Sequence, residues 1–244
     1  MDRPLFSIVT ATRNAAKELQ RTAASLAAQQ WIDFEWIVID GDSTDETKSL
    51  LPTLYGVSDY VSEPDRGIAD AWNKGIERAS GRQVLVLNAG DIYDADMLRI
   101  LAPLVDDEHV TCCHARLSTE DGRPAGEFRS HPGRLWRGMH LAHNWCAVPR
   151  HLYMSRGLYK PMPHAMDYEW FYGYFRERGL QGFTVVDRVL GTYHLGGHSD
   201  MHAAAGFAAN EKIWMESGRS ALVSRLLRLA YTARHILAQT RRKA

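Results

Sequence analysis

The chain has 244 residues and a formal net charge of zero, with 29 basic and 29 acidic side chains. That length is enough for one large α/β domain with a substantial buried core. The apolar and charged fractions are those of an ordinary globular protein, which excludes a disordered or low-complexity chain. The three cysteines show neither metal-ligand spacing nor an even disulfide framework, which favours a reducing compartment.

The charge is unevenly distributed along the chain. Seven basic residues and no acidic residue follow Glu216, so residues 1–218 carry a net charge of −7. This asymmetry predicts an anionic partner for the tail, either a membrane or a nucleic acid. The first residues include too few apolar side chains for a signal peptide, and no apolar run is long enough to span a bilayer. We therefore expect a cytoplasmic protein, peripheral on the inner face of the cytoplasmic membrane.

Predicted strands and helices alternate over the first hundred residues. Apolar runs predict strands at residues 6–11, 34–40, 59–61 and 82–87. Helices are predicted at residues 15–29 and 68–79, and a third starts at residues 43–46. We expect Asn14 to cap the first helix, and Ser43 with Glu46 to form a capping box. The alternation indicates right-handed crossovers and a mostly parallel sheet.

The strand at residues 82–87 points most directly to function, because it runs into Asn88 and Asp91. Ligands bind open α/β sheets outside the carboxyl ends of the strands, and Asp40 ends a neighbouring strand there. Several carboxylates with Arg66 nearby suit a metal-chelated diphosphate, since the cation cancels the repulsion between the anions. The chain has no Gly-x-Gly-x-x-Gly fingerprint after the first strand and no Walker loop, which disfavours hydride transfer and ATP hydrolysis.

Four ordered blocks carry a resemblance to a known family. They read SIVTATRN at residues 7–14, IDGDSTD at 39–45, SEPDRGIADAWNKG at 62–75 and LNAGD at 87–91. The set resembles the inverting family 2 glycosyltransferases, and within them the bacterial enzymes that build surface and capsular polysaccharides. The resemblance implies an α/β fold, a single Rossmann-like domain of the glycosyltransferase A type. It also implies a nucleotide-sugar donor and a divalent cation, Mn²⁺ or Mg²⁺.

The same resemblance implies roles for individual residues. Asp40 would accept a hydrogen bond from the nucleotide base, and Asp91 would hold the metal. Asn88 and Gly90 stand where many relatives carry the two aspartates of an Asp-x-Asp motif, so Asn88 would offer only a carbonyl oxygen. The implied donor-binding residues are Thr10, Ala11, Thr12, Asn14, Asp40, Asp65, Arg66 and Asn88.

In the second half, an aromatic-rich helix is predicted to begin near Asp167. An acid in the first turn of a helix is commonly placed there by the helix dipole alone. The resemblance implies instead that Asp167 is the catalytic base, which takes the proton from the acceptor hydroxyl; Glu169 is the alternative base. The other predicted elements are a helix at residues 97–105, strands at 110–113 and 182–187, and an irregular hairpin within 115–140. The resemblance implies a further strand at residues 143–149, beside the acceptor pocket.

Histidines supply further candidates for the acceptor side. His143 is a candidate acceptor contact, although a lone histidine is about as often structural. His194 and His198 flank two glycines, which predicts a flexible loop that closes over the donor. Because two glycines argue against a helix, a metal site made by this histidine pair is the less favoured interpretation. We count His198 with His143 and Glu169 as the acceptor candidates.

Residues 220–244 are predicted to form one amphipathic helix with basic residues around its polar side. A basic amphipathic helix without acids is typical of a helix lying on an anionic membrane. Each basic residue near such a surface contributes about 1 kcal/mol of electrostatic attraction. The alternative is a helix docked on its own domain or on a second subunit. The apolar stripe consists of Leu222, Leu226, Leu229, Ala233, Ile236 and Leu237, joined by Val223 and Ala230.

The sequence thus predicts a catalytic domain at residues 1–218, with a nucleotide-sugar half at 1–105 and an acceptor half at 106–218, and a basic helix at 219–244. The predicted activity is inverting transfer of a sugar to a hydroxyl of a lipid-linked bacterial glycan, with a glycan or a polyprenyl-linked molecule as the acceptor. A catalytically weak membrane scaffold is the first alternative, favoured by Asn88 and Gly90. A nucleotide-sugar nucleotidyltransferase is disfavoured because residues 10–14 lack a glycine-rich loop, and nucleic-acid binding because the tail has an apolar stripe and no recognition motif.

Overall fold

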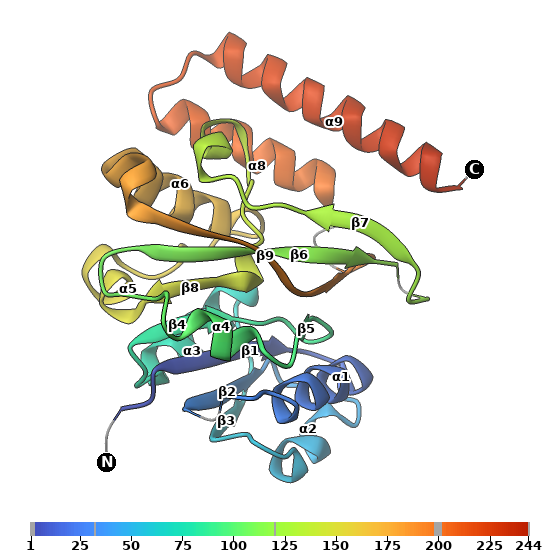
Figure 1. Cartoon of the computed structure of the whole chain (residues 1–244). Helices are drawn as coiled ribbons and strands as arrows, with labels where there is room; N and C mark the ends of the chain where they lie inside the picture. The colour runs from blue at the N-terminus through green and yellow to red at the C-terminus, as the bar shows by residue number, and fades with distance from the viewer. Residues whose placement is uncertain (1–2, 32, 120, 198–201, 244) are drawn as a thin grey trace.

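The structure is a computed structural model that describes residues 3–31, 33–119, 121–197 and 202–243 (Figure 1). Its centre is a mixed sheet with the strand order β3-β2-β1-β4-β8-β6-β9-β5, and β7 pairs with β6. This architecture confirms the predicted α/β fold. The two halves of the sheet differ in strand direction, and the boundary between them lies where β4 meets β8.

The first half of the sheet is parallel, as predicted. β1 (Phe6–Thr12) lies between β2 (Phe34–Asp40) and β4 (Gln83–Val86), and β3 (Asp59–Ser62) pairs with β2. The register sets the last residue of β2 beside the last residues of β1 and β3. Three strand ends therefore meet at one edge, which is where the site was expected.

The second half of the sheet is mixed, so the parallel pattern does not continue through it. β8 is antiparallel to both β4 and β6, whereas β9 is parallel to β6 and antiparallel to the short β5. β7 returns antiparallel on β6 and confirms the predicted irregular hairpin. The bounds are β5 (Ile92–Tyr93), β6 (Val110–Ser118), β7 (Pro124–Phe128), β8 (Cys146–Pro149) and β9 (Phe183–His194).

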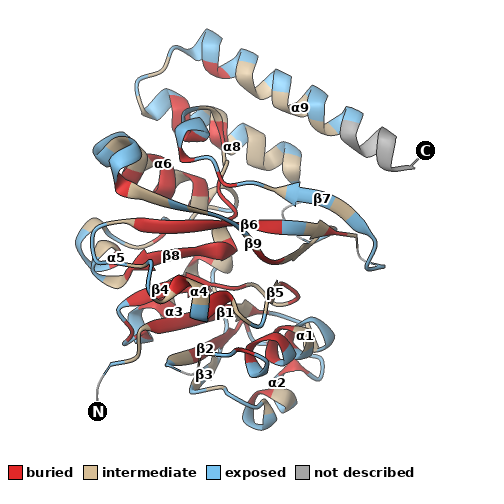
Figure 2. Ribbon diagram, in the orientation of Figure 1, coloured by how far each residue is buried: buried red, intermediate tan, exposed pale blue. Residues whose placement is uncertain are grey.

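Two apolar clusters cover the two faces of the sheet. In Figure 2 the buried residues, coloured red, lie mainly along the central strands and on parts of the helices. Neighbouring residues of β1 face opposite clusters, since side chains alternate along a strand: Val9 packs in one and Ile8 in the other. The cluster around Val9 receives side chains of α3 (Ile68–Arg78) and α6 (Met166–Arg178). The cluster around Ile8 receives those of α1 (Ala16–Ala27) and α4 (Met97–Leu101).

Both predicted helix caps are wrong. Asn14 has a left-handed φ of 49° and precedes the cap position of α1, and its Oδ1 accepts a hydrogen bond from the backbone N–H of Thr44 at 2.8 Å. Ser43 and Glu46 form no capping box at α2 (Thr47–Leu50), because the Ser43 hydroxyl donates to Asp40 instead. Side chains that a local pattern assigns to helix ends thus connect the loops after β1 and β2.

Several predicted bounds also differ from the structure. The predicted strand at residues 182–187 continues as β9 to His194, and the predicted helix at 97–105 ends earlier. Two helices were not predicted: α5 (Arg150–Arg156) and α8 (Ala203–Glu216). The predicted tail helix is confirmed as α9 (Ala221–Lys243). None of the helices in the described residues is long and apolar enough to cross a membrane.

One side of α9 docks on the domain, chiefly on α8 (Figure 1). Arg228 forms an ion pair with Glu211 of α8. The Tyr231 ring packs against Phe207 with centroids 5.7 Å apart, and its hydroxyl lies 3.0 Å from Nε2 of His140. The predicted alternative in which the helix docks on its own domain is therefore right for this side of α9.

Candidate active site

The end of β2 is built around Asp40, which is fully buried. Its Oδ2 accepts hydrogen bonds from the backbone N–H of Ser43 at 3.0 Å and from the Ser62 hydroxyl at 2.7 Å. Its Oδ1 accepts a third bond from the Ser43 hydroxyl. Both carboxylate oxygens are thus engaged within the protein, and they join the turn after β2 to the end of β3.

A second carboxylate closes the space beside that turn. A Cβ at Gly41 would lie 2.3 Å from Oδ2 of Asp65 and 3.4 Å from Cδ of Arg13, so a larger residue there would require the Asp65 side chain to shift. The other oxygen of Asp65 accepts a hydrogen bond from the N–H of Gly67 at 2.9 Å. The structure therefore brings the loop after β3 against the end of β1, with Arg13 exposed beside it.

The remaining donor candidates on β1 have different surroundings. Thr10 is buried, and its hydroxyl accepts a hydrogen bond from Nε1 of Trp36 at 2.9 Å, which is a core contact. Ala11 is half-buried against the cluster around Val9. Thr12 is buried at the strand end, and its hydroxyl finds no hydrogen-bond partner among the described residues. A buried hydroxyl without a hydrogen-bond partner costs free energy. Thr12 is therefore the side chain on this strand that gains most from a hydrogen bond to a ligand.

Arg66 is 83% exposed and forms an ion pair with Asp70 at 2.9 Å. This hydrogen bond is the main cause that lowers the pKa of Asp70. Lys74 also lies 3.5 Å from Asp70 and 2.7 Å from Glu63. Asp70 is therefore an ion-pair partner rather than a freely solvated acid. It holds the exposed Arg66 in the loop between β3 and α3.

The end of β4 leads to Asp91, which is 5% exposed. Its Oδ1 accepts a hydrogen bond from the backbone N–H of His194 at 3.2 Å, and its Oδ2 accepts one from the amide of Asn144. Asn88 lies half-buried just before it, and its Oδ1 accepts a hydrogen bond from Nε1 of Trp72 at 3.1 Å. The oxygen that the sequence suggested as a weak metal ligand therefore already has a partner.

His194 is the second group that suits a cation at this end of β4. Burial, and then the charge of Arg21, lower the pKa of its ring, while a hydrogen bond to the backbone of Gly90 opposes that shift. Nδ1 is buried and has no hydrogen-bond partner among the described residues, so the Gly90 bond is made by Nε2–H. Nδ1 of this neutral ring consequently carries an unshared lone pair, on the residue whose backbone N–H binds Asp91.

One carboxylate and one neutral imidazole fit a divalent cation, and Mn²⁺ accepts both kinds of ligand. The described residues contain no cluster of three or more His, Cys, Asp or Glu side chains that could hold a metal ion. A cation at this position would complete its coordination with phosphate oxygens and water, as Mg²⁺ does in many phosphate sites. Asp91 and His194 are therefore the residues that would hold it.

Asp167 lies in the first turn of α6, after Ala165 in the left-handed conformation with φ 60°. Its side chain is 25% exposed, and its Oδ2 lies 3.9 Å from Nδ1 of His143. Burial lowers the pKa of His143, and the charge of Asp167 only partly opposes that effect. Since Asn144 holds Asp91, two successive residues of the chain face the two candidate carboxylates.

The other acceptor candidates are not brought together with these groups. Glu169 points to Lys160, with which it forms an ion pair at 2.5 Å. His198 lies outside the described residues. Of the three acceptor candidates named from the sequence, only His143 is placed by the structure beside Asp167.

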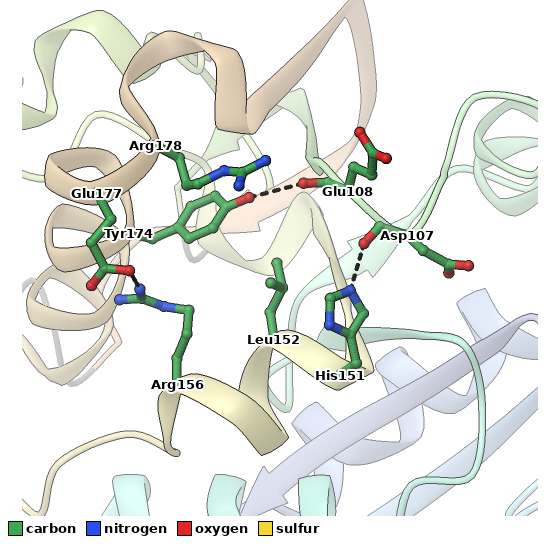
Figure 3. Close-up of a pocket in the computed structure, with 8 residues that line it drawn as sticks. All are labelled: Asp107, Glu108, His151, Leu152, Arg156, Tyr174, Glu177 and Arg178. Carbon is green, nitrogen blue, oxygen red and sulfur yellow. Dashed lines mark hydrogen bonds and ion pairs between the residues drawn. The ribbon is translucent and has the colours of Figure 1, made fainter.

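A separate charged pocket lies between α5 and α6 (Figure 3). Its arginine Arg156 pairs with Glu177, and Tyr174 donates a hydrogen bond to the carbonyl of Glu108 at 3.0 Å. Asp107, which also lines the pocket, pairs with Arg82 just before β4 begins. The pocket is therefore at the amino end of β4, whereas Asp91 follows the carboxyl end, and it contains no residue predicted for the site.

The polar side chains described above lie at the carboxyl edge of the central sheet. The protein therefore has the arrangement of open α/β proteins that bind ligands at this edge. The chain belongs to the glycosyl transferase family 2, whose family model matches residues 7–181. That match confirms the family suggested by the four sequence blocks.

Two curated relatives and two solved structures illustrate the similarity. The "PGL/p-HBAD biosynthesis glycosyltransferase" of Mycobacterium bovis is 37% identical over 112 residues, which are 44% of each chain. The "putative teichuronic acid biosynthesis glycosyltransferase TuaG" of Bacillus subtilis is 29% identical over 141 residues, 54% of this chain and 55% of the relative. The chain thus matches about half the length of these relatives.

Among solved structures, S. aureus TarS in complex with UDP-GlcNAc aligns with a TM-score of 0.66 and 16% identity, covering 94% of this chain and 72% of that one. The mannosyltransferase PcManGT from Pyrobaculum calidifontis, in complex with GDP-Man and Mn²⁺, aligns with a TM-score of 0.62 and 17% identity, covering 97% and 76%. At such low identity these alignments show the shared fold, and they confirm the glycosyltransferase A-type architecture.

Sequence patterns missed two residues that the structure places at the site. Asn144 donates its amide to Asp91, and Arg13 lies beside Asp65 and Gly41. The signal for Asn144 was its position between His143 and the apolar start of β8. Arg13 belongs to the first family-like block, but an exposed arginine in a turn gives no signal of its own.

Proposed function

We propose that the protein is a metal-assisted, inverting glycosyltransferase that moves a sugar from a nucleotide-diphosphate sugar to a hydroxyl of a bacterial glycan. The observation that carries the proposal is that two successive residues of the chain contact two carboxylates from distant parts of the sequence. His143 faces Asp167 at 3.9 Å, and the next residue, Asn144, holds Asp91. This arrangement supports one carboxylate for the leaving group and another for the attacking hydroxyl.

Asp167 is the base in this reaction. It takes the proton from the acceptor hydroxyl as that oxygen bonds to the anomeric carbon of the donor sugar. The bond from this carbon to the diphosphate breaks on the opposite face, so the configuration inverts and the nucleoside diphosphate leaves. Asp167 lies in the first turn of α6, where the helix N-terminus attracts a negative charge.

The donor binds at the ends of β1, β2 and β3. The free hydroxyl of Thr12 and the exposed side chain of Arg13 supply polar contacts there, while Asp40 and Asn14 shape the turn. A bound Mn²⁺ or Mg²⁺ would stabilise the charge that develops on the departing diphosphate. Asp91 would hold that cation through its carboxylate and His194 through Nδ1.

We further propose that the acceptor is lipid-linked and that α9 places the enzyme, from the cytoplasmic side, on the membrane. The apolar stripe of α9 points away from the domain: Leu222 is 70% exposed, Leu226 58% and Leu237 61%. At about 100° per residue, Arg225 and Arg234 fall on opposite margins of this stripe. Both are exposed, which supports a helix lying in an anionic interface with its basic residues at headgroup level.

The test is turnover with a panel of UDP-, GDP- and dTDP-sugars and lipid-linked oligosaccharide acceptors, followed as manganese-stimulated release of nucleoside diphosphate. NMR of the product should show the anomeric configuration opposite to that of the donor. A product with retained configuration would contradict the assignment of Asp167 as a base that acts directly on the acceptor.

A catalytically weak, membrane-bound family member is the second candidate. The observation that favours it is that both oxygens of Asp91 already accept hydrogen bonds from protein groups. A carboxylate has about four lone-pair sites, so a cation can still share this one. A folded protein that binds vesicles but neither binds nor consumes any nucleotide sugar would identify the scaffold.

A further inference from the structure

His143 lies in a closed aromatic pocket beside the candidate base. Its ring centroid is 5.0 Å from that of Trp72, 5.9 Å from that of Tyr159 and 5.7 Å from that of Phe171. Its side chain is only 9% exposed, although it carries two polar nitrogen atoms. Such a ring is expected to have a defined partner for each nitrogen.

The two nitrogens face different groups. Nε2 lies 3.1 Å from the hydroxyl of Tyr159, which in turn lies 2.7 Å from the hydroxyl of Tyr153. Nδ1 faces the carboxylate of Asp167 at 3.9 Å. The result is a chain of polar groups that starts inside the core at Tyr153 and ends at the proposed base.

Only one arrangement of protons satisfies this chain. If Tyr153 donates to Tyr159 and Tyr159 donates to Nε2, each hydroxyl proton has an acceptor and the neutral ring carries its proton on Nδ1, toward Asp167. In the reverse arrangement, the proton of Tyr153 would have no acceptor among the described residues. The reverse arrangement would also point the lone pair of Nδ1 at a carboxylate, which is repulsive.

We propose that His143 is a positioning residue for Asp167: the Tyr153–Tyr159 pair fixes its Nδ1–H tautomer, and this N–H orients one oxygen of Asp167 so that the other faces the acceptor hydroxyl. The proposal rests on the proposed function of Asp167 as base. A distance of 3.9 Å exceeds a hydrogen bond, so the contact must shorten by about 1 Å when the acceptor binds.

The environment favours the neutral ring that this role needs. Burial lowers the pKa of His143 from its ordinary value, so the ring is uncharged at neutral pH. The titratable groups that face it are Asp167 from α6 and the hydroxyl of Tyr159, while Trp72 from α3 and Phe171 from α6 carry no charge. A neutral donor at Nδ1 stabilises the ionised carboxylate by hydrogen bonding.

Two substitutions of His143 distinguish the contribution of Nδ1 from that of Nε2. The amide of His143→Asn takes the place of Nδ1, whereas the amide of His143→Gln takes the place of Nε2. We expect kcat to stay within about tenfold of the parent for His143→Asn and to fall about 100-fold for His143→Gln, with the donor KM unchanged, because a misplacement of about 1 Å costs that much. The acid limb of the kcat profile should move to higher pH only in His143→Gln.

Tyr159→Phe removes a single hydroxyl and tests the tautomer without any substrate. In ¹⁵N NMR of the histidine rings, the parent should show His143 neutral with the proton on Nδ1 at pH 7, and Tyr159→Phe should move population to Nε2–H. The matched control is Tyr174→Phe, which loses a partly buried hydrogen bond at the amino end of β4 and should leave this spectrum unchanged.

A parent His143 that carries its proton on Nε2, or equal kcat values for the Asn and Gln variants, would overturn the proposal. A parent protein that consumes no nucleotide sugar would instead overturn the proposed function. The NMR result distinguishes the two failures, because it depends on the tyrosine pair alone.

Discussion

The ends of β2 and β4 hold their carboxylates in different ways. At the end of β2, Asp40 is held by Ser43, which is three residues away, and by Ser62 of the neighbouring strand β3. Around Asp91 the contacts join residues 53 and 103 positions apart, those to Asn144 and His194. A carboxylate at a strand end can therefore be bound to its own turn, as Asp40 is, or to residues distant in the sequence, as Asp91 is. The second arrangement is the one we propose for catalysis.

The largest effect is expected from Asp167→Asn. The substitution keeps the shape of the side chain but removes the base, so kcat should fall about 10²- to 10⁴-fold while donor binding is unchanged. Steady-state kinetics with manganese and the preferred donor measure this. Glu169→Gln is the matched control on the same helix, and because Glu169 pairs with Lys160 it should change kcat less than about threefold. Equal losses in both variants would place the base elsewhere.

Asp40→Asn should act on stability rather than on chemistry. An amide presents one oxygen to a site that now offers three donors, so about 2 kcal/mol of unfolding free energy should be lost. Urea unfolding measures the loss, and Asp42→Asn is the control because the pair that Asp42 forms with Lys48 is exposed. If Asp40→Asn remains fully stable yet no longer binds nucleotide, Asp40 contacts the base directly, as the family resemblance implies.

A third prediction uses the histidines, all of which lie after the donor half. Burial and the charges of Arg137 and Arg134 lower the pKa of His140 to about 4, and burial also lowers the pKa of His143 and of His194. The unfolded chain binds these protons near pH 6.5, so their stabilising contribution is complete above that pH and is lost as pH falls toward 4.

We therefore expect the unfolding free energy to fall by about 1–2 kcal/mol between pH 7 and pH 4.5. This value is smaller than the pKa shift alone would give, because solvent screens the half-buried His140 ring. Hydrogen exchange at the two pH values should show the acceptor half opening first. His140→Gln should flatten the dependence. A pH response that begins in the donor half would contradict the explanation.

The smallest effect on turnover in solution is expected from the exposed stripe of α9. Leu226→Gln combined with Leu229→Gln should weaken binding to vesicles containing anionic lipid about tenfold or more, because apolar area no longer enters the interface. Turnover with a soluble acceptor should be unchanged. The control is Leu180→Gln, which alters an apolar side chain that is 62% exposed outside α9. Equal vesicle binding by both variants would argue against the membrane contact.

The sequence predicted the donor half more fully than the acceptor half, for physical reasons. The apolar runs of β1, β2 and β4 and the polar residues that follow them depend on neighbours in the chain, so pattern and spacing identify them. Asn14 and Ser43 were misassigned because their side chains reach across to other loops rather than to the nearest helix.

The contacts of the acceptor half could not be predicted in the same way. Asn144 reaches Asp91, and His143 reaches Asp167, only after β8 has paired with both β4 and β6. The free lone pair on Nδ1 of His194 depends on the hydrogen bond between its ring and Gly90. No local pattern encodes these pairings; the sequence offered His143 and the acidic start of the helix at Asp167 as separate candidates, without their contact.

The most direct test of the proposed function is a calorimetric titration with UDP, GDP, dTDP, CDP and ADP, with and without Mn²⁺, on the parent protein and on Asp91→Ala. We predict that one nucleotide binds in a manganese-dependent manner and that this binding disappears in the variant, while unfolding curves show that the variant remains folded. Manganese-independent binding that is equal in both proteins, or no binding by a folded parent, would contradict a metal-assisted transferase centred on Asp91.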